Sequence, residues 1–96
     1  MSSQSDLKKL LSKRSSIKSR LTVFQRFIDN IDIDSISGSN ELKERLEKLI
    51  EKQNQYDDIQ SEIEMRTENA DEQLDVGEDI ENLFYKLITH AKDLLI

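Results

Sequence analysis

The chain of 96 residues contains no Pro, Trp or Cys, and 35% of its residues are hydrophobic while another 35% are charged. This length allows one domain with a modest core, and the lack of cysteine excludes disulfides and thiolate metal sites. No apolar run reaches the roughly 18 residues of a membrane span or resembles a signal peptide, so we expect a soluble protein of the cytoplasm or nucleus.

Charge is divided unequally along the sequence. The first 30 residues carry seven Lys or Arg against two Asp, a net charge of +5, whereas residues 31–96 carry seven basic and 18 acidic side chains, a net charge of −11. The overall net charge of −6 disfavours nucleic acid as a partner of the whole surface. We therefore expect a basic helix that pairs with an acidic one.

The first predicted helix covers about residues 6–31. Its apolar seam advances in alternating steps of three and four, close to four heptads in register, and Arg14 fills the one polar seam position. This spacing is typical of a coiled coil. Further apolar residues beside the seam predict contact with more than one helix.

The second predicted helix covers about residues 41–68. It follows a polar segment that contains Gly38, and Ser39 or Asn40 is suitably placed to cap it. Because the two helices have similar lengths and a connection of about ten residues (31–40), we expect an elongated antiparallel hairpin in which opposite flanking charges attract.

The third predicted helix covers about residues 79–95, after an acidic connection at about residues 69–78. An alternative is that the second helix continues through Ala70 and Leu74 and that Gly77 marks the only break. The third helix has a wide apolar face on a short length, so it packs across the hairpin or is buried in another subunit.

These elements predict an all-α fold with a single helical coiled-coil domain over residues 1–96. It consists of the antiparallel hairpin and a third shorter helix, completed by oligomerisation into a dimer or a higher assembly. The residues predicted to form the core or an interface are Leu7, Leu10, Ile17, Leu21, Phe24, Ile28, Leu42, Leu46, Leu49, Tyr56, Ile63, Ile80, Leu83, Phe84, Leu87 and Ile88.

Polar residues interrupt the seam of the second helix at Gln53, Tyr56 and Gln60. One interpretation is that they fix the register or the oligomeric state. The other is a loose, hydrated seam opposite polar residues of the first helix, such as Arg14 and Ser15. The sequence leaves both interpretations open.

No motif predicts an enzyme, a cofactor or a metal ion. His90 is the only histidine, and a catalytic or ligating role would need partners that the sequence does not provide. The carboxylates of the second helix lack an EF-hand pattern, so we expect them on a solvated or salt-bridged face. No residue is therefore predicted to be catalytic or to bind a cofactor or metal.

The basic first helix is the one candidate for nucleic-acid contact. Clustered Lys and Arg can bind phosphates, but this stretch lacks aromatic residues for stacking on bases. We expect pairing with the acidic helix or with an acidic partner instead. The possible phosphate contacts are Lys8, Lys9, Lys13, Arg14, Lys18 and Arg20.

Three blocks together resemble a known family. They are LLSKRSSIKSRLTVFQRFIDN at residues 10–30, ELKERLEKLIEKQNQYDDIQSEIE at residues 41–64 and ENLFYKLITHAKDLL at residues 81–95. In this order they resemble the N-terminal coiled-coil region of Gag-like polyproteins from Bel/Pao-type LTR retrotransposons. The zinc knuckles and aspartic protease of that family do not follow here, which implies an excised N-terminal module or a small stand-alone derivative.

The function expected from the sequence is non-enzymatic protein–protein interaction and self-assembly, with a homo-oligomer as the main partner. One alternative is a Gag-derived module that binds nucleic acid through the basic first helix. Another is a host-domesticated adaptor or inhibitor that co-assembles with a related Gag. No membrane partner is expected.

Overall fold

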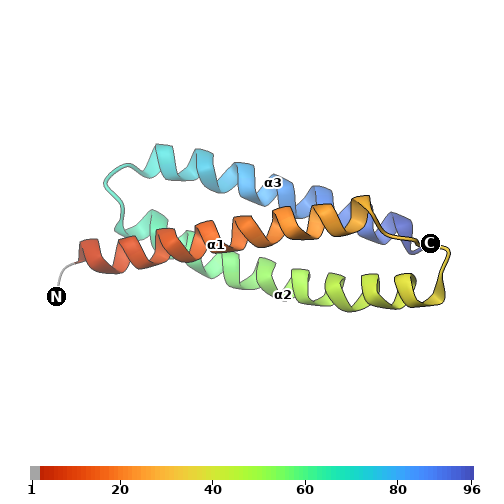
Figure 1. Cartoon of the computed structure of the whole chain (residues 1–96). Coiled ribbons are helices and arrows are strands. Elements are labelled where there is room, and N and C mark those ends of the chain that lie inside the picture. Colours follow the sequence, from red (N-terminus) through yellow and green to blue (C-terminus); the bar gives the residue numbers. More distant parts are fainter. Residues whose placement is uncertain (1–2) are drawn as a thin grey trace.

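Three helices form an elongated bundle in a computed structural model that describes residues 3–96, with side chains from residue 5 onward. They are α1 (Ser3–Asp29), α2 (Ile36–Arg66) and α3 (Ala70–Leu94). Each helix runs antiparallel to the one before it, and the bundle measures 51 × 23 × 18 Å (Figure 1). The structure confirms the predicted all-α fold, the antiparallel hairpin and the third, shorter helix. Within the described range, no helix has the length and apolarity to cross a membrane.

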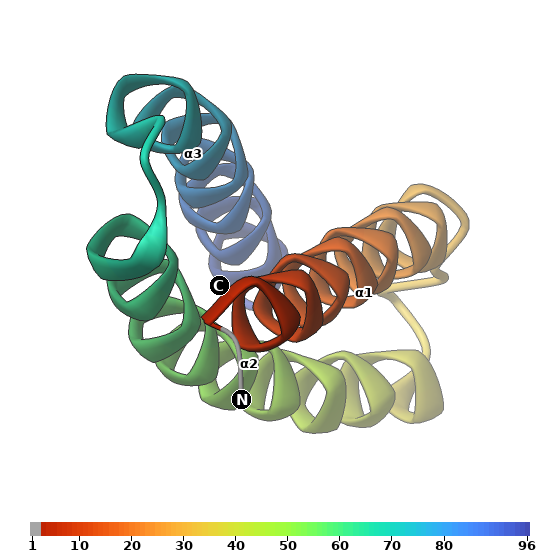
Figure 2. The same ribbon diagram turned by 90° about the vertical axis from the view of Figure 1, so that its left-hand side faces the viewer.

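The core lies between all three helices, which surround it when the bundle is viewed from its end (Figure 2). Leu21 of α1, Leu42 of α2 and Phe84 of α3 are completely buried. Leu7 and Leu83 are partly buried. The other residues predicted for the core or an interface are buried: Leu10, Ile17, Phe24, Ile28, Leu46, Leu49, Tyr56, Ile63, Ile80, Leu87 and Ile88.

The wide apolar face of α3 packs across the hairpin within the same chain. Phe84 and Leu87 of α3 belong to the same buried cluster as Leu21 of α1 and Leu46 of α2. The face that suggested burial in another subunit is therefore covered without one. Oligomerisation stays a prediction, and it now requires a different surface.

The first turn is shorter than predicted, because α2 begins at Ile36 rather than at about residue 41. Ser35 is the N-cap, in place of the expected Ser39 or Asn40, and its Oγ accepts a hydrogen bond from the Gly38 backbone N–H at 2.9 Å. Ser35 Oγ also donates to the Asp32 carbonyl oxygen at 3.0 Å. A Cβ at residue 38 would collide with that carbonyl, so glycine is required inside the first helical turn.

The prediction of an acidic connection at residues 69–78 was wrong, because α3 begins at Ala70 and continues through this segment. Asp71 and Glu72 lie in the first turn of α3, where carboxylates interact favourably with the helix dipole. The connection is limited to residues 67–69. The alternative in which α2 continues past Ala70 was also wrong.

Gly77 lies inside α3 and does not break it. A Cβ at this position would lie 2.6 Å from Cδ of Gln60 on α2. Glycine therefore permits the close approach of α2 and α3, which explains a residue that costs helix propensity in the middle of a helix.

Candidate functional site

Arg14 belongs to the bundle interior, so its prediction as a phosphate contact was wrong. Only 7% of the residue is exposed. Its Nη1 donates a hydrogen bond to Gln60 Oε1 at 2.9 Å, and its Nη2 donates to Gln73 Oε1 at 2.6 Å. The seam position of Arg14, which directs the side chain toward α2 and α3, accounts for this burial.

Polar residues of the α2 seam form further hydrogen bonds beside Arg14. Gln60 Nε2 donates to Glu64 Oε2 at 2.8 Å and to the Gln73 carbonyl oxygen at 2.9 Å. Tyr56 donates its hydroxyl proton to the Gly77 carbonyl oxygen at 2.7 Å. Among the described residues, no buried side-chain N or O atom lacks a hydrogen-bond partner. Of the two interpretations of this seam, specific pairing that fixes the register fits these contacts better.

Burial changes the acid–base behaviour of two of these hydrogen-bonded residues. It lowers the pKa of Arg14, an effect that the neighbouring Tyr56 partly opposes. It also raises the pKa of Tyr56 to about 12, although the charge of Arg14 acts in the opposite direction. A guanidinium group remains protonated under ordinary conditions, so both groups hold their protons at neutral pH. These hydrogen bonds join the three helices to one another.

The five other predicted phosphate contacts are exposed but do not form one surface. Helical spacing places Lys9, Lys13 and Arg20 on one side of α1, since they are separated by four and seven residues. Lys8 is rotated by about 100° from Lys9, and Lys18 by about 200° from Arg20, at 3.6 residues per turn. The positive charge of α1 is therefore spread around the helix.

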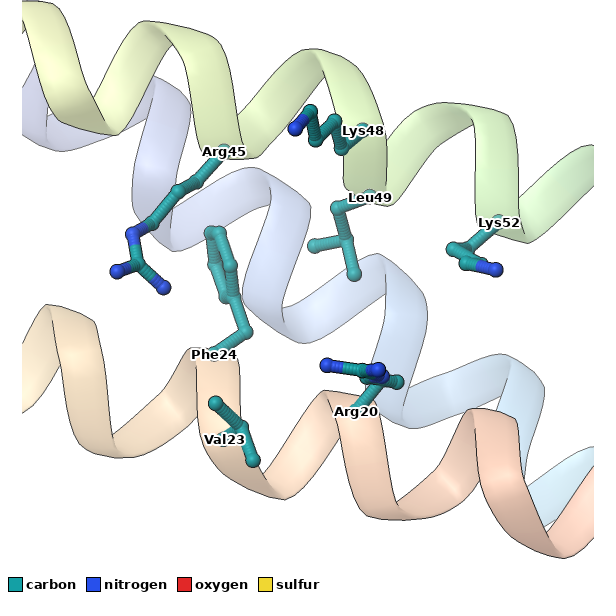
Figure 3. Close-up of a pocket in the computed structure, with 7 residues that line it drawn as sticks. All are labelled: Arg20, Val23, Phe24, Arg45, Lys48, Leu49 and Lys52. Atoms are coloured by element: carbon teal, nitrogen blue, oxygen red, sulfur yellow. The ribbon is translucent and has the colours of Figure 1, made fainter.

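A shallow groove of about 270 Å³ lies between α1 and α2, and we call it the basic groove. Phe24 of α1 and Leu49 of α2 point into the space between the two helices, with α3 behind them (Figure 3). The lining residues are Arg20, Val23, Phe24, Arg45, Lys48, Leu49 and Lys52.

The cations of the basic groove are largely without anionic partners. Arg45 contacts Glu41 through an ion pair of 2.8 Å and lies with its guanidinium carbon 4.1 Å from the centre of the Phe27 ring. In the described part of the chain, no carboxylate oxygen lies within 4.0 Å of the charged nitrogens of Arg20, Lys48 or Lys52. Four like charges around an apolar floor give this surface a positive potential on an acidic protein.

The positive surface continues toward the beginning of α1. A neighbouring hollow is lined by Lys13 and Ile17 of α1 and by Asp58 and Ile59 of α2, and it shares Lys52 with the basic groove. Lys13 therefore extends the line of cations along the boundary between the two helices, and Asp58 is the one acid in this lining.

This arrangement corrects the expectation that the basic helix pairs electrostatically with an acidic one. Of the described residues, Arg66 of α2 and Asp6 of α1 form the ion pair that joins two helices, with a separation of 3.7 Å and with the signs opposite to those expected. Along the groove, Arg20 of α1 instead lies beside three basic residues of α2, which are Arg45, Lys48 and Lys52. Apolar contacts hold the hairpin together against this local repulsion.

The sequence pattern alone did not indicate Arg45, Lys48 and Lys52 as candidate site residues. Their spacing of three and four residues places them on one flank of α2. That signal was present in the sequence, but the net negative charge of the helix concealed it. Only the pairing of α1 with α2 places these three residues beside Arg20.

His90 is exposed on α3, and no group of three or more His, Cys, Asp or Glu in the described range is arranged to hold a metal ion.

Comparison with known proteins gives no relative for this chain: no protein-family model, no curated protein and no solved structure matches it. The resemblance to Bel/Pao-type Gag-like polyproteins therefore stays a prediction.

Proposed function

We propose that this chain is a non-enzymatic protein–protein interaction module and that its basic groove binds an acidic amphipathic helix. The observation that carries the proposal is the combination of four cations with an apolar floor, in which exposed Val23 lies beside the largely buried Phe24 and Leu49. An amphipathic helix that lies in a hydrophobic groove is a recurring mode of protein recognition.

The charges define which helices the groove accepts. Glu or Asp side chains along the edges of a bound helix would pair with Arg20, Lys48 and Lys52, which have no carboxylate partner among the described residues. Such pairs contribute mainly to the association rate and to the choice of partner. Apolar side chains on the buried edge of that helix would cover Val23, which is 41% exposed.

Nucleic acid is the second candidate occupant of the groove, and the groove chemistry favours it less. Single-stranded nucleic acids are held by aromatic side chains that stack on bases as well as by cations. Phe24 is buried, and Phe27 is partly buried with Arg45 over one face of its ring, so the groove does not offer an open aromatic surface for stacking. Burial of Arg14 removes one of the six predicted phosphate contacts, and the other five are spread around α1.

Titration of fluorescently labelled model helices tests this proposal. The probes are a helical peptide with Glu and Leu on one face, the same peptide with Lys in place of Glu, and an RNA strand of matched charge. Of the three probes, we expect only the acidic peptide to bind well. Binding should weaken at least about tenfold in the variant Lys48→Glu/Lys52→Glu, because two attractive pairs become repulsive.

The matched control is Lys43→Glu/Lys92→Glu, which makes the same change in net charge at exposed lysines that do not line the groove. Equal losses in both variants would show that net charge, and not the groove, governs binding. No binding of the acidic peptide refutes the proposal. Preferential binding of RNA, with an affinity that falls steeply as salt increases, would instead support nucleic acid as the ligand of the groove.

The proposed groove function is also compatible with the alternative of a host-domesticated adaptor, which came from the Gag-like resemblance. A host-domesticated adaptor that co-assembles with a related Gag would need a surface for a helical partner, and the basic groove provides one. Mixing the chain with such a relative and measuring the mass of the products tests that alternative.

A further inference from the structure

The first half of α3 has the opposite chemistry to the basic groove. Residues 70–81 contain six Asp or Glu and no Lys or Arg. Five exposed residues lie along one side of this helix: Asp71, Leu74, Asp75, Glu78 and Tyr85. Successive members are three, one, three and seven residues apart, which keeps them on the same side of an α-helix. We call these five residues the acidic stripe.

The acidic stripe also contains exposed apolar surface. Leu74 is 47% exposed and Tyr85 is 57% exposed, and both belong to the few large hydrophobic residues that the bundle leaves uncovered. An acidic helix face with an apolar residue near each end is the type of partner that the basic groove requires. The same chain therefore carries both members of a complementary pair.

The two surfaces lie on opposite sides of one molecule. The buried face of α3, with Ile80, Phe84 and Leu87, packs against α1 and α2, and α3 lies behind the basic groove as seen in Figure 3. The acidic stripe consequently points away from the groove of its own chain. A molecule cannot fill its own groove, but a second copy can.

The lengths of the two surfaces agree. From Lys13 to Phe24, α1 contributes about 17 Å to the groove and its neighbouring hollow, and residues 71–85 of the acidic stripe span about 21 Å. Resting on the proposed function of the groove, we propose that its occupant is the acidic stripe of a second copy of this chain.

This contact joins two different surfaces, so it is heterologous. Each molecule keeps one free groove or one free acidic stripe after it binds a neighbour, and further copies therefore add head to tail in a ring or an open filament. The exposed ion pairs weaken as salt screens them. Assembly is thus concentration-dependent and stronger at low salt.

Sedimentation velocity at low and high salt tests the arrangement with full-length protein. The variant Lys48→Gln/Lys52→Gln removes two of the four positive charges of the groove. Asp75→Asn/Glu78→Gln removes two of the three carboxylates of the acidic stripe, and all four substituted side chains are exposed. We expect wild type to grow beyond a dimer as its concentration rises at low salt. Each variant alone should associate at least about tenfold more weakly.

An equimolar mixture of the two variants is the decisive sample. One variant supplies an intact acidic stripe and the other an intact groove, so the mixture should form a 1:1 complex and nothing larger. The control Lys43→Gln/Glu62→Gln alters exposed residues of α2 outside both surfaces and should assemble like wild type. Circular dichroism establishes that every variant remains helical.

Several outcomes would overturn the inference: wild type that stops at a symmetric dimer, variants that assemble like wild type, or a mixture that behaves as the separate variants do. A wild-type chain that stays monomeric at every concentration also overturns it. If the groove nevertheless binds the acidic model peptide, the proposed function stands and only the identity of the partner is wrong. Failure of both experiments refutes both.

Discussion

Where α2 approaches α3, the side chain of Gln60 occupies the space that a side chain at Gly77 would need. Gln60 is only 8% exposed, and hydrogen bonds to Arg14, Glu64 and Gln73 hold its amide group. A methyl group at residue 77 would meet that amide group. The amide cannot turn aside without breaking bonds to a buried cation, so the space must be left empty by a glycine.

The effect of Gly77→Ala should therefore change sign with the residue at position 60. With Gln60 present, we expect this substitution to lower the free energy of unfolding by about 1–3 kcal/mol, because the added methyl group displaces the bonded amide. In a Gln60→Ala background the obstacle is gone, and Gly77→Ala should raise stability by about 0.5–1 kcal/mol through helix propensity. Urea denaturation of the four chains measures both effects, and additive changes would refute the steric explanation.

Tyr56 makes stability depend on pH in the alkaline range. Burial raises its pKa from 10.0 to about 12 in the folded protein, so the folded state keeps this proton more tightly than the unfolded state does. The resulting stability is fully present below pH 10 and is lost as pH rises toward 12. We expect a loss of about 2 kcal/mol in the free energy of unfolding over this window.

Urea denaturation at several alkaline pH values measures this loss, and Tyr56→Phe is the control. Phe keeps the ring that packs 5.5 Å from the centre of the Phe84 ring but has no proton to lose. The variant should be less stable near neutral pH by about 1 kcal/mol, because the hydrogen bond to Gly77 is missing. It should also lose less stability on alkaline titration; an unchanged pH dependence would assign the effect to other groups.

Among the features of single helices, the first residues of α2 and α3 differ most from those predicted from the sequence. Ser, Asp and Gly between residues 31 and 40 were interpreted as one long turn. Ser35 instead caps α2, and Gly38 takes a helical place that no larger residue could occupy. Likewise, the acidic composition of residues 69–78 suggested a loop, although carboxylates are favourable at the beginning of a helix.

The cap at Ser35 gives a prediction for the start of α2. Ser35→Ala removes the oxygen that accepts from the Gly38 N–H and donates to Asp32, and we expect a loss of about 1 kcal/mol in the free energy of unfolding. Ser37→Ala, an exposed change in the same turn, should have almost no effect. Thermal unfolding of both variants makes the comparison, and equal melting temperatures would contradict the assigned cap.

At the scale of the whole molecule, one chain covers its own apolar faces. Phe84 and Leu87 of α3 pack in the core against α1 and α2, so a second copy of the chain is not needed to bury these apolar residues. Any assembly must then use exposed surfaces, and these are divided by charge: the basic groove lies on one side and the acidic stripe on the other. This division is why assembly is predicted to depend on salt and to proceed head to tail.

The sequence by itself determined the helical class, the antiparallel hairpin and most of the core, because apolar residues repeat with the period of a helix whichever partner covers them. Leu21, Leu42 and Phe84 illustrate this, since all three were predicted for the core or an interface and are completely buried. Charge was less informative along the chain, since net charge per segment does not reveal the flank of the helix on which each cation lies. Arg14 was predicted as a surface contact although its seam position already pointed inward.

Only the tertiary structure decided which surfaces meet. The close approach that requires Gly77, the acceptors of Arg14 and the alignment of Arg20 with Lys48 and Lys52 all involve residues distant in the chain. Such contacts depend on how far one helix is shifted and rotated against another, and small packing differences set these quantities. The basic groove exists because the packing places two basic flanks side by side.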